Sequence, residues 1–219
     1  MGWGWRLAMM SVAATQAVSK RARASRGRLV AIEGPDCAGK TTAARRLADE
    51  QGFEYVKLPN RATPTGQLLD RFIKRQHVFS DDHVHNERAA QLLFAANNHE
   101  ARAAIVRMLE SGRDVVLDRY LPSGVVYHSA AVGSDQRDFI VALNRGMPMP
   151  DLVVVFEVDV DVASARRPDY GTERNDTREI QRAVSEGFRR HFPPGDGVAY
   201  VDANRTADEV FADVARLVE

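Results

Sequence analysis

The sequence predicts a doubly wound α/β fold, in which helices cover both faces of a five-stranded parallel sheet. Short apolar runs alternate with amphipathic helical patterns along the chain, and this alternation is typical of parallel strands joined by right-handed crossovers. A glycine-rich segment, residues 34–41, stands directly after the first apolar run. Because ligands of such sheets collect at the carboxyl ends of the strands, we expect the functional side chains at that edge.

The first half of the chain is predicted to contain three strands and three helices. Residues 28–33 are apolar enough for a strand covered on both faces. A helix over 40–50, a short strand over 54–58 and a helix over about 65–75 follow, the last with an apolar stripe. The polar cap at 80–82 begins the longest helix, which extends to about Ser111 and ends before Gly112. Residues 115–117 form the third strand.

The second half repeats the pattern with two strands and five helices. Helices are expected over about 123–131 and 135–145, and Pro148 and Pro150 then interrupt the pattern. A buried strand is expected over 152–158 and a helix over 160–166. After a polar stretch, a second helix covers 178–191, and a last strand over 198–201 and a last helix over 207–218 follow.

Composition limits the function classes. The 219 residues suit one domain, and 30 basic and 30 acidic side chains cancel, so bulk charge gives no reason to expect a nucleic-acid or membrane partner. A single cysteine excludes an internal disulfide and a multi-cysteine metal site. No apolar stretch approaches the roughly 18 residues needed to span a bilayer. We therefore expect a cytoplasmic protein without a membrane or nucleic-acid partner.

The amino-terminal segment has a different composition from the rest. Residues 1–28 contain six basic and no acidic side chains. This composition fits a transit peptide to mitochondria or another organelle, but also a disordered basic leader or an upstream start codon. We expect a leader over 1–26 and a single folded domain over 27–219.

The segment after the first strand has the spacing of a phosphate-binding loop. Gly34 and Gly39 allow the backbone N–H groups to point inward, and the next helix adds its positive dipole end. Lys40 can reach the β- and γ-phosphates, and the Thr41 hydroxyl can ligate magnesium. The sequence therefore predicts a nucleotide-binding protein.

Charged side chains also follow the second and third strands. Asp118 can hold magnesium through water, and Arg119 can bind a phosphate through paired hydrogen bonds. Arg61 is a second candidate for binding an anion, and two arginines suit the phosphate of an acceptor. The alternatives are an ion pair between Asp118 and Arg119 that closes the turn, and a surface arginine at position 61.

Two further segments are candidates for substrate contact. Phe94, Asn97 and Asn98 share one helix face, where a ring and two amides could hold a nucleobase, although an aromatic residue there could equally belong to the core. Residues 165–178 are rich in arginine and fit a mobile lid that brings an arginine to the transferring phosphate. A solvated connecting loop is the alternative.

Six segments in chain order resemble the thymidylate kinases, which are nucleoside monophosphate kinases of the P-loop NTPase superfamily. The resemblance covers residues 27–219. It rests on Glu33-Gly34-x-Asp36-x-x-Gly39-Lys40-Thr41, Leu58-Pro59-Asn60-Arg61, Leu93-Phe94-Ala95-Ala96-Asn97, Asp118-Arg119-Tyr120-x-x-Ser123-Gly124, Pro150-Asp151-Leu152 and Gly171-x-Glu173-Arg174. It implies transfer of a phosphoryl group from ATP with Mg²⁺ to dTMP, giving dTDP on the pathway to dTTP, by a homodimer.

The resemblance also implies roles for individual residues. Asp36 would bind the deoxyribose 3′-hydroxyl, Phe94 would stack on thymine, Tyr127 would crowd the 2′ position, and Gln181 would lie near the nucleoside. ATP would contact Gly34, Asp36, Cys37, Ala38, Gly39, Lys40, Thr41 and Thr42. The dTMP site would comprise Asp36, Arg61, Phe94, Asn97, Asn98, Arg119, Tyr127 and Gln181. Catalysis would rest on Lys40, Asp118, Arg119 and Arg174, with Thr41 and Asp118 at the metal.

Three positions depart from the family pattern. Cys37 stands where one branch of the family has an arginine in the loop, so a lid arginine, Arg174 or Arg166, would supply the charge. Cys37 itself could be a small space-filling residue or a redox-active thiol. Asn98 replaces an arginine that donates to the thymine carbonyl, and Asn175 replaces a lid tyrosine. These departures keep open a broader pyrimidine nucleoside monophosphate kinase, and a non-catalytic nucleotide-binding protein is the other alternative.

Overall fold

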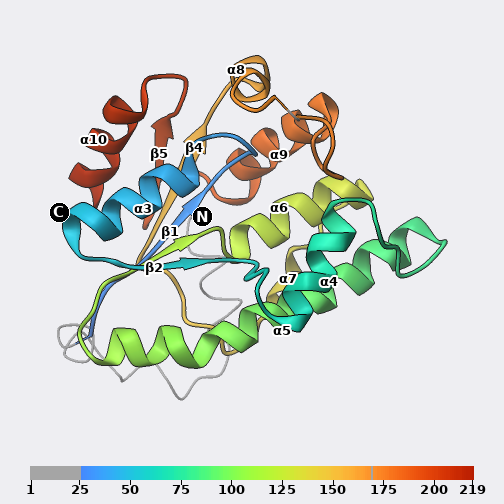
Figure 1. Ribbon diagram of the computed structural model, residues 1–219, viewed down its shortest axis with the longest axis horizontal. Helices are drawn as coiled ribbons and strands as arrows, with labels where there is room; N and C mark the ends of the chain where they lie inside the picture. The colour runs from blue at the N-terminus through green and yellow to red at the C-terminus, as the bar shows by residue number, and fades with distance from the viewer. Residues whose placement is uncertain (1–25, 169) are drawn as a thin grey trace.

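The computed structural model describes residues 26–168 and 170–219, which form a central sheet with helices on both faces (Figure 1). The sheet is parallel throughout, and its strands lie in the order β2 (Glu54–Lys57), β3 (Val115–Asp118), β1 (Leu29–Glu33), β4 (Leu152–Glu157) and β5 (Val198–Asp202). The predicted five-stranded parallel sheet is confirmed for the described residues, and each strand boundary lies within one residue of its prediction.

The helices also match their predictions. They are α3 (Lys40–Gln51), α4 (Pro64–Ile73), α5 (His83–Glu110), α6 (Leu121–Val132), α7 (Arg137–Leu143), α8 (Val160–Ala165), α9 (Arg178–His191) and α10 (Ala207–Val218). Helix α6 begins two residues earlier than predicted because Pro122 is tolerated in a first helical turn. Helix α7 begins two residues later than predicted. The Asp135 carboxylate accepts a hydrogen bond from the Arg137 N–H, which holds residues 135 and 136 outside the helix.

Strands β1, β3, β4 and β5 bury side chains on both faces, and the half-buried Val56 and Tyr55 of the edge strand β2 pack against opposite faces, so the sheet separates two apolar clusters. Leu29, Ala31 and Val115 face the cluster that includes residues of α5, α6 and α9. Val30, Ile32 and Val116 face the cluster that includes residues of α3, α8 and α10. This alternation follows from the two-residue period of a strand. Because the strands are parallel, their order places the carboxyl ends of β2, β3 and β1 side by side at the edge that carries the site.

The fold already includes the last part of the basic segment. The Arg26 guanidinium lies 2.8 Å from the Asp151 carboxylate, and that of Arg28 lies 2.7 Å from Asp114. Residues 1–25, on which the expectation of a transit peptide or leader rests, lie outside the described residues. Among the helices that the structure describes, none combines the length and the apolar content needed to cross a bilayer.

Candidate active site

The phosphate loop connects β1 to α3. Gly34 has φ 133° and lies against the Phe156 backbone, where a Cβ would come within 2.5 Å of the Phe156 carbonyl oxygen, so only glycine fits. Cys37 and Gly39 also have positive φ values, 60° and 90°. Ala38 is buried and Thr42 is exposed. Gly39 is the residue that precedes α3, so the predicted loop lies at the amino end of that helix.

Lys40 is buried beneath this loop. Its ammonium donates a hydrogen bond to the Pro35 carbonyl oxygen. Burial, together with the nearby charge of Arg119, lowers the Lys40 pKa to about 7, although Asp36 and Asp118 oppose the shift. The buried ammonium therefore lies in a position that an anion in the loop would stabilise.

Two oxygen ligands meet where β3 ends beside α3. The Thr41 hydroxyl donates to Asp118 Oδ2 at 2.5 Å, and the Lys57 ammonium lies 3.0 Å from both the Thr41 hydroxyl and that carboxylate oxygen. Burial acts to raise the Asp118 pKa, but the Thr41 hydrogen bond and the Lys57 charge outweigh it, so the pKa is lowered. Asp118 is thus held as a carboxylate beside a hydroxyl.

Arg119 joins the phosphate loop to the cavity beside it. Its guanidinium forms an ion pair with Asp36 and donates to the Gly34 carbonyl and the Ser123 hydroxyl, both at 3.2 Å. Burial acts to raise the Asp36 pKa, but the charges of Arg119 and Lys40 outweigh it and the pKa is lowered. The backbone of Arg119 has φ 71°, so the side chain leaves the strand end from a left-handed turn.

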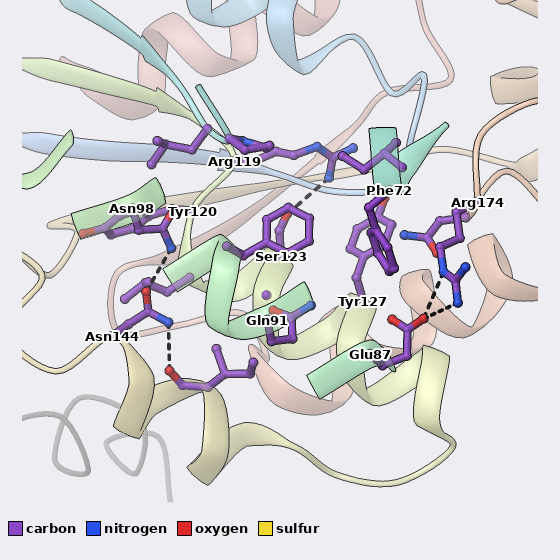
Figure 2. Close-up of a pocket in the computed structure, with 18 of the residues that line it drawn as sticks. Phe72, Glu87, Gln91, Asn98, Arg119, Tyr120, Ser123, Tyr127, Asn144 and Arg174 are labelled. Atoms are coloured by element: carbon purple, nitrogen blue, oxygen red, sulfur yellow. Dashed lines mark hydrogen bonds and ion pairs between the residues drawn. The ribbon is translucent and has the colours of Figure 1, made fainter. Parts of the chain in front are cut away.

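A cavity of about 140 Å³ lies between α4, α5, α6 and residues 173–175 of the segment predicted to be a lid (Figure 2). Both predicted phosphate-binding arginines, Arg61 and Arg119, line it, as do Phe94, Asn98 and Tyr127. The Arg61 guanidinium lies 2.7 Å from the Asp70 carboxylate. The structure therefore brings together the acceptor-site candidates that the sequence draws from four separate segments.

The α5 wall of the cavity is a stripe of four residues. Glu87, Gln91, Phe94 and Asn98 all line the cavity, and their spacing places them on one face of the helix. The sequence analysis finds only Phe94 and Asn98, although extending the same spacing toward the start of the helix identifies the other two. Glu87 and Gln91 are each less than a tenth exposed, so this polar edge of the cavity is shielded from bulk solvent.

Asn97, which the sequence places at the dTMP site, does not line this wall of the cavity. It lies about 90° around the helix from the stripe, given 100° per residue. Its Oδ1 accepts from the Asn60 N–H at 2.7 Å, and its Nδ2 donates at 2.9 Å to the hydroxyls of Thr63 and Thr65. Fully buried, Asn97 anchors the loop that carries Arg61.

Gln181 also lies behind the cavity and does not line it. Its Nε2 donates to the Asp36 carboxylate at 2.8 Å and to the Asn175 carbonyl at 2.7 Å, and its Oε1 accepts from the Asp36 N–H at 2.9 Å. Only Asp36 and Asn175 of this group line the cavity. Gln181 is thus a bridge from α9 that joins Asp36 of the phosphate loop to Asn175.

The two lid arginines proposed for catalysis, Arg174 and Arg166, lie in different places. Arg174 donates to the Glu87 carboxylate at 2.9 and 2.6 Å and lies over the Phe72 ring at 4.6 Å, inside the acceptor cavity. Arg166 instead donates to the carbonyl oxygens of Cys37 at 3.4 Å and Ala203 at 2.7 Å. In this arrangement Arg166, and not Arg174, lies next to the phosphate loop.

Glu33 is a buried group to which the sequence analysis assigns no role. Its carboxylate accepts from the Tyr120 N–H at 2.8 Å and from the Ser123 hydroxyl at 2.5 Å, so it fastens the start of α6 to the end of β1. Burial raises its pKa to about 7. Glu33 and Ser123 both lie within the quoted motifs, but motif spacing alone does not reveal that they bond to each other.

Known proteins resemble the chain over most of its length. A family model described as thymidylate kinase matches residues 32–214. The chain is 34% identical over 200 residues to the thymidylate kinase of Danio rerio, covering 89% of this chain and 91% of that protein. It is also 34% identical over 204 residues to that of Schizosaccharomyces pombe, covering 89% and 92%. The solved thymidylate kinase of Candida albicans has a TM-score of 0.73 at 27% identity, covering 88% of this chain and 91% of that one. The chain belongs to the thymidylate kinase family.

Proposed function

We propose that this protein transfers the γ-phosphoryl group of ATP to dTMP, giving dTDP and ADP. The observation that carries the proposal is the position of Arg119, which contacts the phosphate loop through the Gly34 carbonyl and also lines the acceptor cavity. A donor phosphate in the loop and an acceptor phosphate in the cavity would meet at this guanidinium. The relatives named above are thymidylate kinases, which supports the same reaction.

The donor half uses the loop of residues 34–42. Its backbone N–H groups and the amino end of α3 favour a polyphosphate, and Lys40 would bind the β- and γ-phosphates from below. Transfer of this kind needs positioning and neutralisation of charge, with no covalent intermediate on the protein. Arg119, and a lid arginine beside the loop, would supply the remaining positive charge.

Magnesium fits the group formed by Thr41 and Asp118. A hydroxyl and a carboxylate are the hard oxygen ligands that Mg²⁺ prefers, and in kinase sites the ion completes its shell with water and substrate phosphates. In the described residues no cluster of three or more His, Cys, Asp or Glu side chains could hold a metal by itself, so a shared site of this kind suits the chain. When bound, the ion would neutralise charge on the donor phosphates.

The acceptor half uses the cavity. Arg61 and Arg119 would bind the dTMP phosphate, Phe94 would stack on thymine, and Tyr127 would stand near the sugar. Asp36, oriented by Gln181, would accept a hydrogen bond from the 3′-hydroxyl. These residues are the polar and aromatic lining expected of a small-molecule site.

Assembly and location are further parts of the proposal. The family resemblance supports a homodimer, and Val84 and Leu92 on α5 are 40% and 55% exposed, which gives a helical surface suited to packing. We expect the chain in the cytoplasm unless residues 1–28 direct it to mitochondria or another organelle.

An acceptor panel tests the proposed reaction. ADP release should be fastest with dTMP among dTMP, dUMP, UMP, dCMP and dGMP. Rapid turnover of dCMP or UMP with none of dTMP would overturn the acceptor, and ATP binding without turnover would favour a non-catalytic protein. Arg119→Ala should lower kcat/KM for dTMP by at least about 10², while Arg119→Lys, which keeps the charge, should lose less.

A broader pyrimidine nucleoside monophosphate kinase is the second candidate. Asn98 and Asn175, both in the cavity lining, are shorter than the arginine and tyrosine that the family resemblance leads us to expect. The structure of the Candida albicans relative was linked to broad substrate specificity of that enzyme. In the same panel, comparable kcat/KM values for dTMP and dCMP would favour this candidate.

A further inference from the structure

Asn144 is a buried residue at the edge of the acceptor cavity that the proposed reaction does not use. It follows the last residue of α7 and is 3% exposed. Its Nδ2 donates to the Ile140 carbonyl oxygen at 2.9 Å, and its Oδ1 accepts from Asn98 Nδ2 at 2.9 Å. Figure 2 shows these contacts as a chain that runs from the α7 backbone to the cavity wall.

The chain fixes which end of each amide faces which neighbour. A backbone carbonyl oxygen only accepts hydrogen bonds, so Asn144 must direct its amino group to Ile140 and its oxygen to Asn98. That oxygen also only accepts, so Asn98 must direct its amino group to Asn144. Turning over either amide would place two acceptors or two donors together, which costs free energy in a buried place.

This orientation leaves two defined groups on Asn98 for a ligand, its carbonyl oxygen and the second N–H of its amino group. Among the described residues, no donor is bonded to Asn98 Oδ1. This oxygen is also absent from the set of buried atoms without a partner, so it is accessible to a ligand. The free side of the Asn98 amide therefore presents its carbonyl oxygen in a fixed direction. The Ile140 carbonyl, two hydrogen bonds away, sets that direction.

A fixed amide can distinguish the two pyrimidines that matter here. At positions 4 and 3, thymine offers an acceptor and then a donor, whereas cytosine offers a donor and then an acceptor. An amide held in one orientation complements only one of these patterns, because the other leaves polar groups mismatched. An amide free to turn over can complement either pattern.

We infer that Asn144 is a positioning residue for base selectivity, acting through the Asn98 amide. The inference rests on the proposed function, since it assumes that the cavity holds the base of a pyrimidine nucleotide. Asn98 would contact the base directly, whereas Asn144 acts only by orienting the Asn98 amide. Removing Asn144 should therefore change the choice between thymine and cytosine more than it changes the overall rate.

The test compares kcat/KM for dTMP and dCMP in the full chain and in two variants. Asn144→Leu has a similar size but forms no hydrogen bonds, so the Asn98 amide can turn over, and the ratio of the two kcat/KM values should move toward one by about fivefold or more. Asn144→Gln keeps an amide that can donate to the Ile140 carbonyl and accept from Asn98 Nδ2, so it should retain more of the wild-type ratio than Asn144→Leu. The KM for ATP and the melting temperature of each variant report on the donor site and the fold.

Two results would overturn the inference. One is an unchanged ratio in Asn144→Leu, with both kcat/KM values reduced in parallel, as a purely structural role would give. The other is an equal loss of selectivity in Asn144→Gln, which would show that the orientation of the Asn98 amide is not the cause. If the wild-type protein phosphorylates neither nucleotide, the proposed function fails separately, and calorimetric Kd values for dTMP and dCMP still test the effect of Asn144.

Discussion

The phosphate loop and the acceptor cavity meet at Arg119, but they are built in opposite ways. The loop comes from one continuous segment, residues 34–42, and its shape depends on backbone angles such as those of Gly34 and Gly39. The cavity is lined by α4, α5, α6 and the lid, which are far apart in the sequence. The donor site is thus encoded locally, whereas the acceptor site depends on how the helices pack.

Their charges differ in the same way. In the loop, the Lys40 ammonium is buried and its pKa is lowered to about 7. In the cavity, each arginine already has a carboxylate partner: Asp70 for Arg61, Asp36 for Arg119 and Glu87 for Arg174. An incoming polyphosphate would relieve an unfavourable burial at Lys40, whereas an acceptor phosphate must compete with existing ion pairs.

The largest expected effect is at the loop. Lys40→Met should lower kcat by at least about 10³, while the melting temperature should hold or rise because a buried ammonium is removed. Steady-state kinetics and calorimetry measure both quantities. A Lys40→Met variant that keeps its kcat would show that the donor phosphates do not depend on this side chain.

Proton linkage gives the same variant a second readout. The Lys40 pKa is about 7 in the folded protein and has a reference value of 10.5, so between these pH values the unfolded chain binds more protons. The contribution of Lys40 to the free energy of unfolding therefore rises as pH increases from 7 to 10.5. Urea unfolding at pH 7 and pH 9.5 should show a smaller rise for Lys40→Met than for the wild type, and an equal rise would contradict the assignment.

An intermediate effect should separate the two lid arginines. Arg166 touches the loop at the Cys37 carbonyl, whereas Arg174 is held by Glu87 in the cavity. Arg166→Ala should lower kcat by about 10², and Arg174→Ala should mainly raise KM for dTMP. Each variant removes one arginine side chain from the same segment, so each serves as the control for the other. The reverse outcome would mean that the lid rearranges and brings Arg174 to the transferring phosphate.

The contrast between loop and cavity also explains which features the sequence could predict. Strand and helix positions follow from apolar periodicity, which depends on neighbouring residues, and all agree with the structure within about two residues. The loop is contiguous, so its spacing determines which residues curl around a phosphate. Arg61 and Arg119 follow from the rule that strand ends share an edge. The orientations of Asn97 and Gln181 could not be predicted, because each depends on a loop from a distant part of the chain.

The smallest expected effect tests the difference between the wall of the cavity and the support behind it. Asn97→Ala should lower the free energy of unfolding by about 1–3 kcal/mol, because a fully buried side chain and its hydrogen bonds to Asn60, Thr63 and Thr65 are lost. The KM for dTMP should rise only a few-fold through the displaced Arg61 loop. Asn98→Ala, one residue along α5, is the matched control: it removes an amide from the cavity wall and should affect KM more and stability less. If Asn97→Ala instead raises KM strongly at unchanged stability, Asn97 contacts the base and the division of α5 into wall and support fails.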